Sequence, residues 1–204
     1  MACLRQALWL VRTAFAGAGV DPETILEVEP DVIGIRPEAW LELDVTSFEA
    51  AARQRGLRPI SAVDIYRGDL VEALGHECFA AERERLSDLY EDALAVVAAD
   101  RLASGDTDAA RAAAERLLAR DPLREEAHAV LIAVYGQTGS RSQVVRQYRR
   151  LKDILRRELD VDPLPETDVV YRGALTRALA ESRRRSAAGA FASPTFASAL
   201  VAQG

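Results

Sequence analysis

The chain has 204 residues, enough for one large domain or two small ones and for a sizeable core. Hydrophobic residues make up 49% and charged residues 28%, a balance that is ordinary for a soluble protein and has no signature of disorder. The formal net charge of −6 gives no overall electrostatic reason to bind nucleic acid, so any DNA contact must come from a local basic patch.

The two cysteines, Cys3 and Cys78, lack the spacing of a metal site and suit a reducing compartment better than a disulfide scaffold. The first twenty residues lack the pattern of a signal peptide, and no apolar stretch has the length of a membrane span. We therefore expect a cytoplasmic protein without a membrane partner.

The first predicted element is a helix over residues 2–16, ended by the glycines that follow. Its apolar face consists of Leu4, Leu8, Val11 and Phe15. Its other face carries Arg5, Trp9 and Arg12, with Gln6 and Thr13 alongside. Next, the β-branched runs ILEV and VIGI, separated by EPD, predict a small hairpin that Pro37 closes.

From Asp44 onward the pattern predicts helices only. A capped helix starts in DVTSFEAAARQR, and SAVDIYRGDLVEAL predicts a shorter helix and turn that Gly68 interrupts. Longer helices are expected at about 79–103, 107–120, 123–138, 141–159 and 166–184, the last beginning after two prolines. The tail 185–204, uncharged after Arg185, is predicted to be a flexible terminus or linker.

An internal repeat is visible in the helical part. Gly105 and Gly139 lie 34 residues apart, each in a turn between two helical runs. The same offset pairs Val97 with Leu131, Ala98 with Ile132, Ala110 with Val144, Ala114 with Tyr148 and Leu117 with Leu151. A period of about 34 residues with helix–turn–helix content is typical of tetratricopeptide repeats, which usually form binding surfaces. A generic helical bundle is the alternative.

The motifs YRGDL, DPLREEAH and REL-x-VDPLPET make residues 44 to 181 resemble the bacterial transcriptional activator domain. The resemblance implies a tetratricopeptide-like module that, in this family, follows a winged helix-turn-helix. LRQALWLVRTAF is similar to the recognition helix and ILEVEPDVIGIRP to the wing. The implied organisation is a partial winged helix at 1–43, the activator domain at 44–184 and the tail.

The resemblance places Arg5, Gln6, Trp9, Arg12 and Thr13 where a recognition helix meets the major groove. Arginine suits guanine edges and phosphates, and glutamine suits adenine. The alternative, favoured for this chain alone, is the solvated face of a helix that lacks the scaffold to hold it in a groove. Residues 1–44 hold three arginines against eight acids, a net −5 that is unfavourable for phosphate contacts.

A second candidate surface lies in residues 141–157, which carry seven basic residues and one acid. Arg146, Arg149 and Arg150 could touch DNA flanks or an acidic partner. The more common explanation for such a run is a solvated outer face.

We find no motif for catalysis, a cofactor or a metal. His76-Glu77 lacks the second histidine of a zinc motif because residue 80 is alanine, and His128 is expected to be structural. We therefore expect a mainly α protein without enzymatic activity: a regulator that binds promoter DNA if its winged helix is complete. Its repeats would contact a second copy or the transcription machinery. The alternative is a stand-alone interaction module without autonomous DNA binding.

Overall fold

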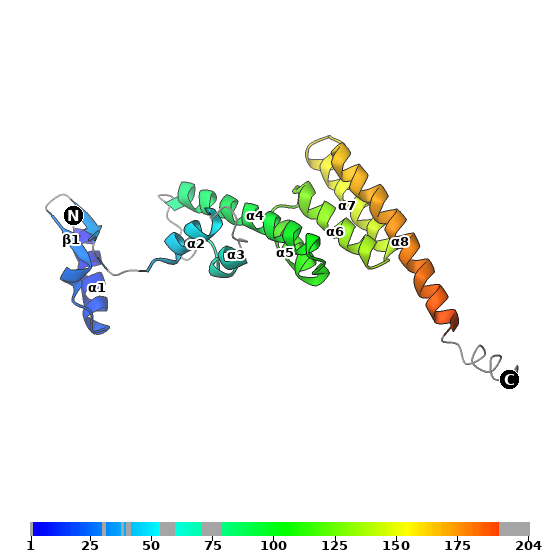
Figure 1. Ribbon diagram of the computed structural model, residues 1–204. Helices are drawn as coiled ribbons and strands as arrows, with labels where there is room; N and C mark the ends of the chain where they lie inside the picture. The colour runs from blue at the N-terminus through cyan, green and yellow to red at the C-terminus, as the bar shows by residue number, and fades with distance from the viewer. Residues whose placement is uncertain are drawn as a thin grey trace, which may run out of the picture. The chain divides into compact units, whose positions relative to one another are not determined.

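The computed structural model describes residues 2–29, 32–37, 39, 42–53, 60–70 and 79–191 (Figure 1). The chain divides into two compact units, Met1–Thr46 and Ser47–Gly204. Residues 192–204 of the predicted tail lie outside the described residues.

The N-terminal unit consists of one helix followed by a hairpin. Helix α1 spans Ala2–Gly17, a short 3-10 turn η1 spans Pro22–Thr24, and strands β1 (Leu26–Val28) and β2 (Ile33–Ile35) pair antiparallel. The strand register sets Leu26 opposite Ile35 and Val28 opposite Ile33. Among the residues of this unit whose burial the structure describes, Ile25 and Leu26 are the buried ones, and they form a small core.

In the described part of the C-terminal unit, every regular element is a helix. Its helices are α2 (Asp44–Arg53, which begins just before the boundary), α3 (Ile60–Ile65), α4 (Ala80–Ala103), α5 (Thr107–Arg120), α6 (Glu125–Gln137), α7 (Arg141–Glu158) and α8 (Pro165–Phe191). The mainly α fold class is confirmed. Helix α8 continues past residue 184, into residues predicted to be tail.

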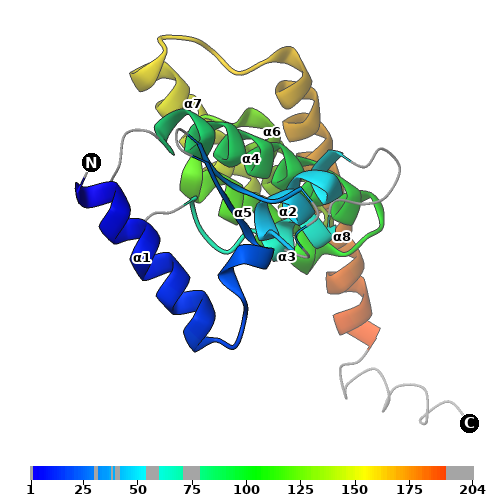
Figure 2. The same ribbon diagram turned by 90° about the vertical axis from the view of Figure 1, so that its left-hand side faces the viewer.

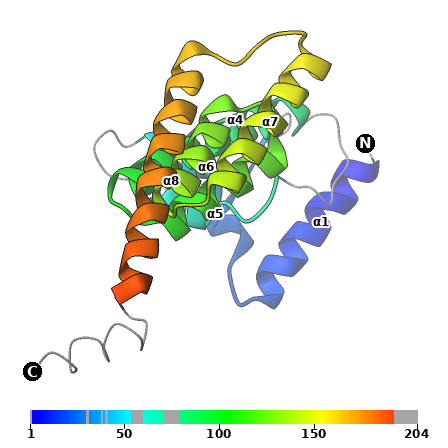
Figure 3. The same ribbon diagram turned by 90° about the vertical axis from the view of Figure 1, so that its right-hand side faces the viewer.

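Consecutive helices form packed pairs, α4 with α5 and α6 with α7, and α8 covers α6 and α7 (Figures 1 and 3). Gly105 and Gly139 adopt positive φ angles of 81° and 72°, which an L side chain rarely accepts. The amide of Asp106 bonds the carbonyl of Arg101, and the amide of Ser140 bonds that of Tyr135 in the same way. The two turns are therefore the same glycine-dependent helix cap, one repeat apart.

Burial follows the 34-residue offset as well. Four of the predicted pairs are buried on both sides: Val97 with Leu131, Ala98 with Ile132, Ala110 with Val144, and Leu117 with Leu151. In the fifth, Ala114 is buried and Tyr148 partly so. Equivalent positions thus fill equivalent places in two stacked helix pairs, which is how repeat proteins build a continuous core.

The three family motifs hold helices together. In YRGDL, the hydroxyl of Tyr66 donates to Asp69 over 2.7 Å, and Asp69 pairs with Arg120 of α5 over 2.8 Å. The Tyr66 ring also stacks on Tyr90 of α4, with centroids 4.1 Å apart. This cluster fixes the segment after α3 to the helix pair α4 and α5. Figure 2 shows this helix pair from the side of α2 and α3.

The other two motifs meet each other. Glu125, in DPLREEAH, accepts hydrogen bonds of 3.0 Å from the amide of Leu164 and the hydroxyl of Thr167, both in DPLPET. A carboxylate at the first turn of α6 therefore also satisfies a free amide next to the first turn of α8. Motifs 39 residues apart form one joint between helices.

Helices α6 and α8 cross closely at Gly136. A Cβ atom at this position would lie 2.8 Å from both the Cα and the Cβ of Ala174. Gly173, one residue earlier in α8, has open space on the side where a Cβ would lie.

We expect Gly136→Ala to destabilise the domain, because the new methyl meets backbone that cannot move alone. Overpacking lowers the free energy of unfolding by about 1–3 kcal/mol, whereas the higher helix propensity of alanine raises it by up to about 1 kcal/mol. The control Gly173→Ala should stabilise by up to about 1 kcal/mol. Urea unfolding of both variants measures the difference, and equal effects would contradict the close crossing.

His128 forms a buried polar link between α6 and α7. Its Nε2 lies 3.1 Å from the carbonyl oxygen of Pro122, and its Nδ1 lies 2.8 Å from the side-chain amide of Gln147. A neutral ring protonated at Nε2 satisfies both contacts. Burial lowers the pKa of His128, because the low-dielectric interior disfavours the charged imidazolium. The residue is structural, as the sequence predicts.

The pH dependence of stability follows from that shift. As pH falls through the unfolded-state pKa of about 6.5, the unfolded chain takes up a proton that the folded chain refuses. The free energy of unfolding should therefore fall between pH 7.5 and 5.5, by at most about 1.4 kcal/mol per pH unit. Urea unfolding of His128→Gln should show a flatter dependence over this range, and an equally steep one would refute the assignment.

Candidate functional site

Three of the five predicted DNA-contact residues project from α1. Arg5, Gln6 and Trp9 are exposed, and 64% of the Trp9 surface is accessible. The helix therefore offers a guanidinium, an amide and an indole on its outer side, side chains that can reach base edges and phosphates in a groove.

The other two predicted contacts are engaged within the unit. Arg12 pairs with Glu23 of η1, with 2.7 Å between the nitrogen and the carboxylate oxygen. The Nε of Arg12 is buried and has no hydrogen-bond acceptor within the described residues. The Thr13 hydroxyl donates to the Trp9 carbonyl over 2.8 Å. An arginine neutralised by a carboxylate is a weak phosphate ligand.

The predicted apolar face of α1 is only partly covered. Leu8 and Phe15 are half-buried, and Val11 is exposed. The Leu4 side chain lies outside what the structure describes. Exposed Ile33 and Ile35 on β2 add to the apolar surface of the unit. Large exposed apolar side chains in one small unit indicate a surface that other elements cover.

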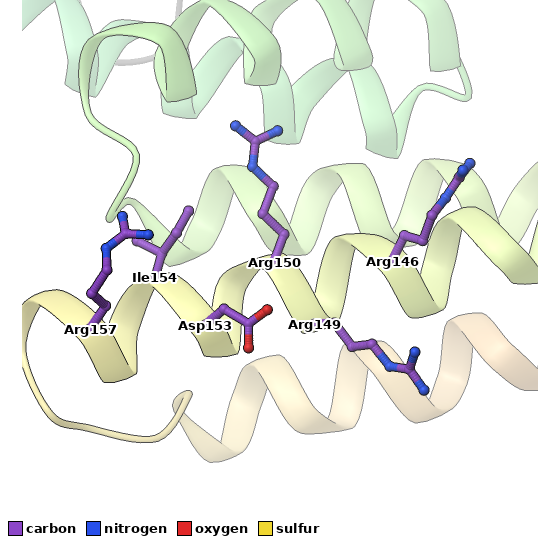
Figure 4. A pocket seen from close by; sticks show the side chains of 6 residues that line it. All are labelled: Arg146, Arg149, Arg150, Asp153, Ile154 and Arg157. Carbon is purple, nitrogen blue, oxygen red and sulfur yellow. The ribbon is translucent and has the colours of Figure 1, made fainter.

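The second candidate surface runs along α7. Six of its residues line one open depression of about 490 Å³: Arg146, Arg149, Arg150, Asp153, Ile154 and Arg157 (Figure 4). We call this face the α7 arginine stripe. The spacing of three and four residues places the positions of all six on one side of the helix. Of these six residues the sequence predicts only Arg146, Arg149 and Arg150 as a partner surface, although the same helical spacing also places Ile154 and Arg157 on this side.

The opposite face of α7 fixes the orientation of the stripe. Val144, Leu151 and Leu155 are buried there, and buried Gln147 holds His128. Tyr148 stacks on Tyr171 of α8 with centroids 3.9 Å apart, and its hydroxyl bonds Asp168. Burial and this carboxylate raise the pKa of Tyr148 to about 12, so the phenol remains a donor at neutral pH.

The arginines of the stripe differ in their pairing. Within the described part of the chain, Arg146, Arg149 and Arg150 form no ion pair or hydrogen bond, whereas Arg157 pairs with Glu158 at 2.8 Å. The remaining basic residues near the end of α7 are also paired, Lys152 with Asp162 and Arg156 with Asp160. Free guanidinium groups are thus concentrated on the stripe.

The described residues contain no group of three or more histidine, cysteine, aspartate or glutamate side chains placed to hold a metal ion. Among the helices that the structure describes, none has the length and apolarity to cross a membrane.

Comparison with known proteins places these features in a family. A family model described as the bacterial transcriptional activator domain matches residues 43–175. The chain belongs to this family. The match begins one residue before α2 and ends within α8, so the activator domain comprises both repeat pairs and the α7 arginine stripe.

Among curated relatives, the transcriptional regulatory protein MoaR1 of Mycobacterium tuberculosis is 31% identical over 176 residues, covering 79% of this chain and 56% of MoaR1. MoaR1 of Mycobacterium bovis is 30% identical with the same coverage. The solved structure of Mycobacterium tuberculosis EmbR with a low-affinity phosphopeptide matches with a TM-score of 0.59 and 25% identity, covering 92% of this chain and 54% of EmbR. The chain spans about half the length of these relatives.

The pairing of Arg12 yields a testable expectation. Glu23→Gln removes the carboxylate from Arg12, whereas the control Glu29→Gln removes the same charge from a side chain without an ion pair among the described residues. The freed arginine should raise affinity for non-specific duplex DNA about threefold over the control. It should also steepen the slope of log affinity against log salt by about 0.9. Equal behaviour of the two variants in fluorescence anisotropy would show that Arg12 does not reach phosphate.

Proposed function

We propose that the protein is a transcriptional regulator in which α1 and the β1–β2 hairpin serve as recognition helix and wing. In this proposal the activator domain supplies the contact with a second copy or with the transcription machinery. The observation that carries the proposal is the family match, together with the similarity to a curated transcriptional regulatory protein.

The N-terminal geometry supports the DNA-reading part. A single helix that presents Arg5, Gln6 and Trp9 is followed, after the short turn η1, by a two-stranded hairpin, the order of elements expected for a recognition helix and its wing. The apolar side chains of α1 and β2 are partly exposed. This exposure supports the proposal that the N-terminal unit packs against further helices, which would hold α1 in the groove.

The charge of the N-terminal unit favours a second candidate function, a protein-interaction module without autonomous DNA binding. Residues 1–44 carry a net −5 and the guanidinium of Arg12 is neutralised, so we expect the 204-residue chain to bind DNA weakly by itself. A protein-interaction module without autonomous DNA binding would show no promoter association of its own.

Chromatin immunoprecipitation of the protein, tagged at its own locus, distinguishes the two. We expect discrete promoter peaks that fall about tenfold or more in Arg5→Ala/Gln6→Ala, since each base contact contributes about 1–3 kcal/mol. Arg177→Ala, on exposed α8 surface, removes the same charge and should leave the peaks unchanged. Absence of peaks would favour the interaction module, and peaks insensitive to the double substitution would refute the role of α1.

A further inference from the structure

The α7 arginine stripe combines an excess of positive charge with an apolar centre. Arg146, Arg149 and Arg150 are exposed and have no acceptor within the described residues. Ile154 is half-buried in the same depression, and Figure 4 shows it extending to the same side of α7 as Arg150 and Arg157. The surface is thus an aliphatic side chain flanked by the guanidinium groups of Arg150 and Arg157, while the side chain of Arg149 extends to the other side of α7, on a chain whose net charge is −6.

We infer that the α7 arginine stripe is a docking surface for an acidic amphipathic helix of a partner protein. This inference rests on the proposed function in one respect, namely that the helical domain is the part that contacts other proteins. It adds the surface on this domain and the chemistry of the segment that binds there.

The residue types favour a protein partner. Lys152, the single lysine of the chain, lies off the stripe and pairs with Asp162, so every cation of the stripe is a guanidinium, a group common in protein interfaces. A guanidinium binds a carboxylate through two parallel hydrogen bonds, and it loses less hydration than an ammonium group when covered. Ile154 offers the apolar contact that binding energy usually needs at the centre of an interface.

The surrounding charges disfavour DNA as the occupant. Asp153 lies within the stripe, and acidic side chains follow at the C-terminal end of α7 and beyond: Glu158, Asp160 and Asp162. Each of those last three acids pairs with a basic residue of α7, so the free positive charge does not continue past the C-terminal end of the stripe, and a DNA duplex, which extends its phosphate charge over a large surface, meets no matching charge there. A single partner helix needs complementary charge only along the face with which it contacts α7.

The geometry sets the form of the partner segment. From residue 146 to residue 157 the stripe extends about 16 Å along α7, or roughly three helical turns. A partner helix with carboxylates at i and i+4 on both sides of an aliphatic side chain would place its charges opposite arginines one turn apart. Because the inner face of α7 is buried against α6 and α8, the stripe requires no rearrangement before binding.

The test uses the 204-residue chain and a fluorescent helical peptide of about 15 residues, with glutamates one turn apart flanking leucines. A scrambled peptide of identical composition and a non-specific DNA duplex are the other probes. The variants are Arg146→Glu/Arg150→Glu, Ile154→Ala and the matched control Arg177→Glu/Arg183→Glu on exposed α8 surface. Circular dichroism verifies that each variant is folded.

We expect the amphipathic peptide to bind and the scrambled one to bind at least about fivefold more weakly. The stripe reversal should weaken binding about tenfold or more, Ile154→Ala several-fold, and the control less than twofold. Raising the ionic strength to about 0.3 M should weaken binding by the wild type more than binding by the stripe reversal.

Three results would overturn the inference: no peptide binding, equal binding of the scrambled peptide, or equal losses in the stripe and control variants. DNA binding that disappears in the stripe reversal and is not displaced by the peptide would assign the surface to nucleic acid instead. Promoter occupancy of Arg5→Ala/Gln6→Ala tests the proposed function separately, because those residues lie in the other unit. Peptide binding can therefore fail while the proposed function stands, and promoter occupancy can fail while the peptide still binds the stripe.

Discussion

The activator domain depends on covering α6 from every side. Residues 130–134 of this helix are five consecutive apolar side chains, all buried, so no solvent-facing strip remains along its middle. Helices α4, α5, α7 and α8 all pack against it. Burial of a large aliphatic side chain contributes roughly 1.5–3 kcal/mol, so exposing any of these faces would cost a sizeable part of the stability of a small domain.

This requirement explains the most specific sequence motifs. Covering α6 with α8 requires the chain to leave α7, turn and return. The turn is anchored by Glu125, at the start of α6, on the amide of Leu164 and the hydroxyl of Thr167. Gly136 then lets α8 approach the end of α6 at backbone distance. On the other side, α7 is aligned through the contact of Gln147 with His128. The motif residues act as joints around one buried helix.

Much of the fold was predictable because its determinants are local. Glycines at positive φ, Gly105 and Gly139, end two of the helices, and Pro165 begins α8. The spacing of apolar residues indicates which helix faces are buried. The end of α8 was not predictable in this way. The small residues after position 184 have no periodic apolar pattern, yet alanine has high helix propensity and the helix continues to Phe191.

The candidate sites were less predictable because they depend on tertiary pairing. Helical spacing groups Arg12 with Arg5, but only the fold brings Glu23 to within 2.7 Å of Arg12 and neutralises it. Similarly, seven basic residues in 141–157 look equivalent in sequence. The loop after α7 provides carboxylates for Lys152 and Arg156, and Arg157 pairs with Glu158. Among the described residues the free charge therefore lies on Arg141, Arg146, Arg149 and Arg150.

Both proposed surfaces are local positive features on a chain of net negative charge. Its long-range field therefore repels rather than attracts a polyanion, and rapid electrostatic steering is not available to it. Any binding must come from close contacts within about one Debye length, where Arg5 or the α7 arginine stripe outweighs the neighbouring acids. Such contacts select by geometry and chemical type, because the overall charge gives no affinity that is independent of fit. This constraint favours segments that match the spacing of a helix face over extended charged surfaces.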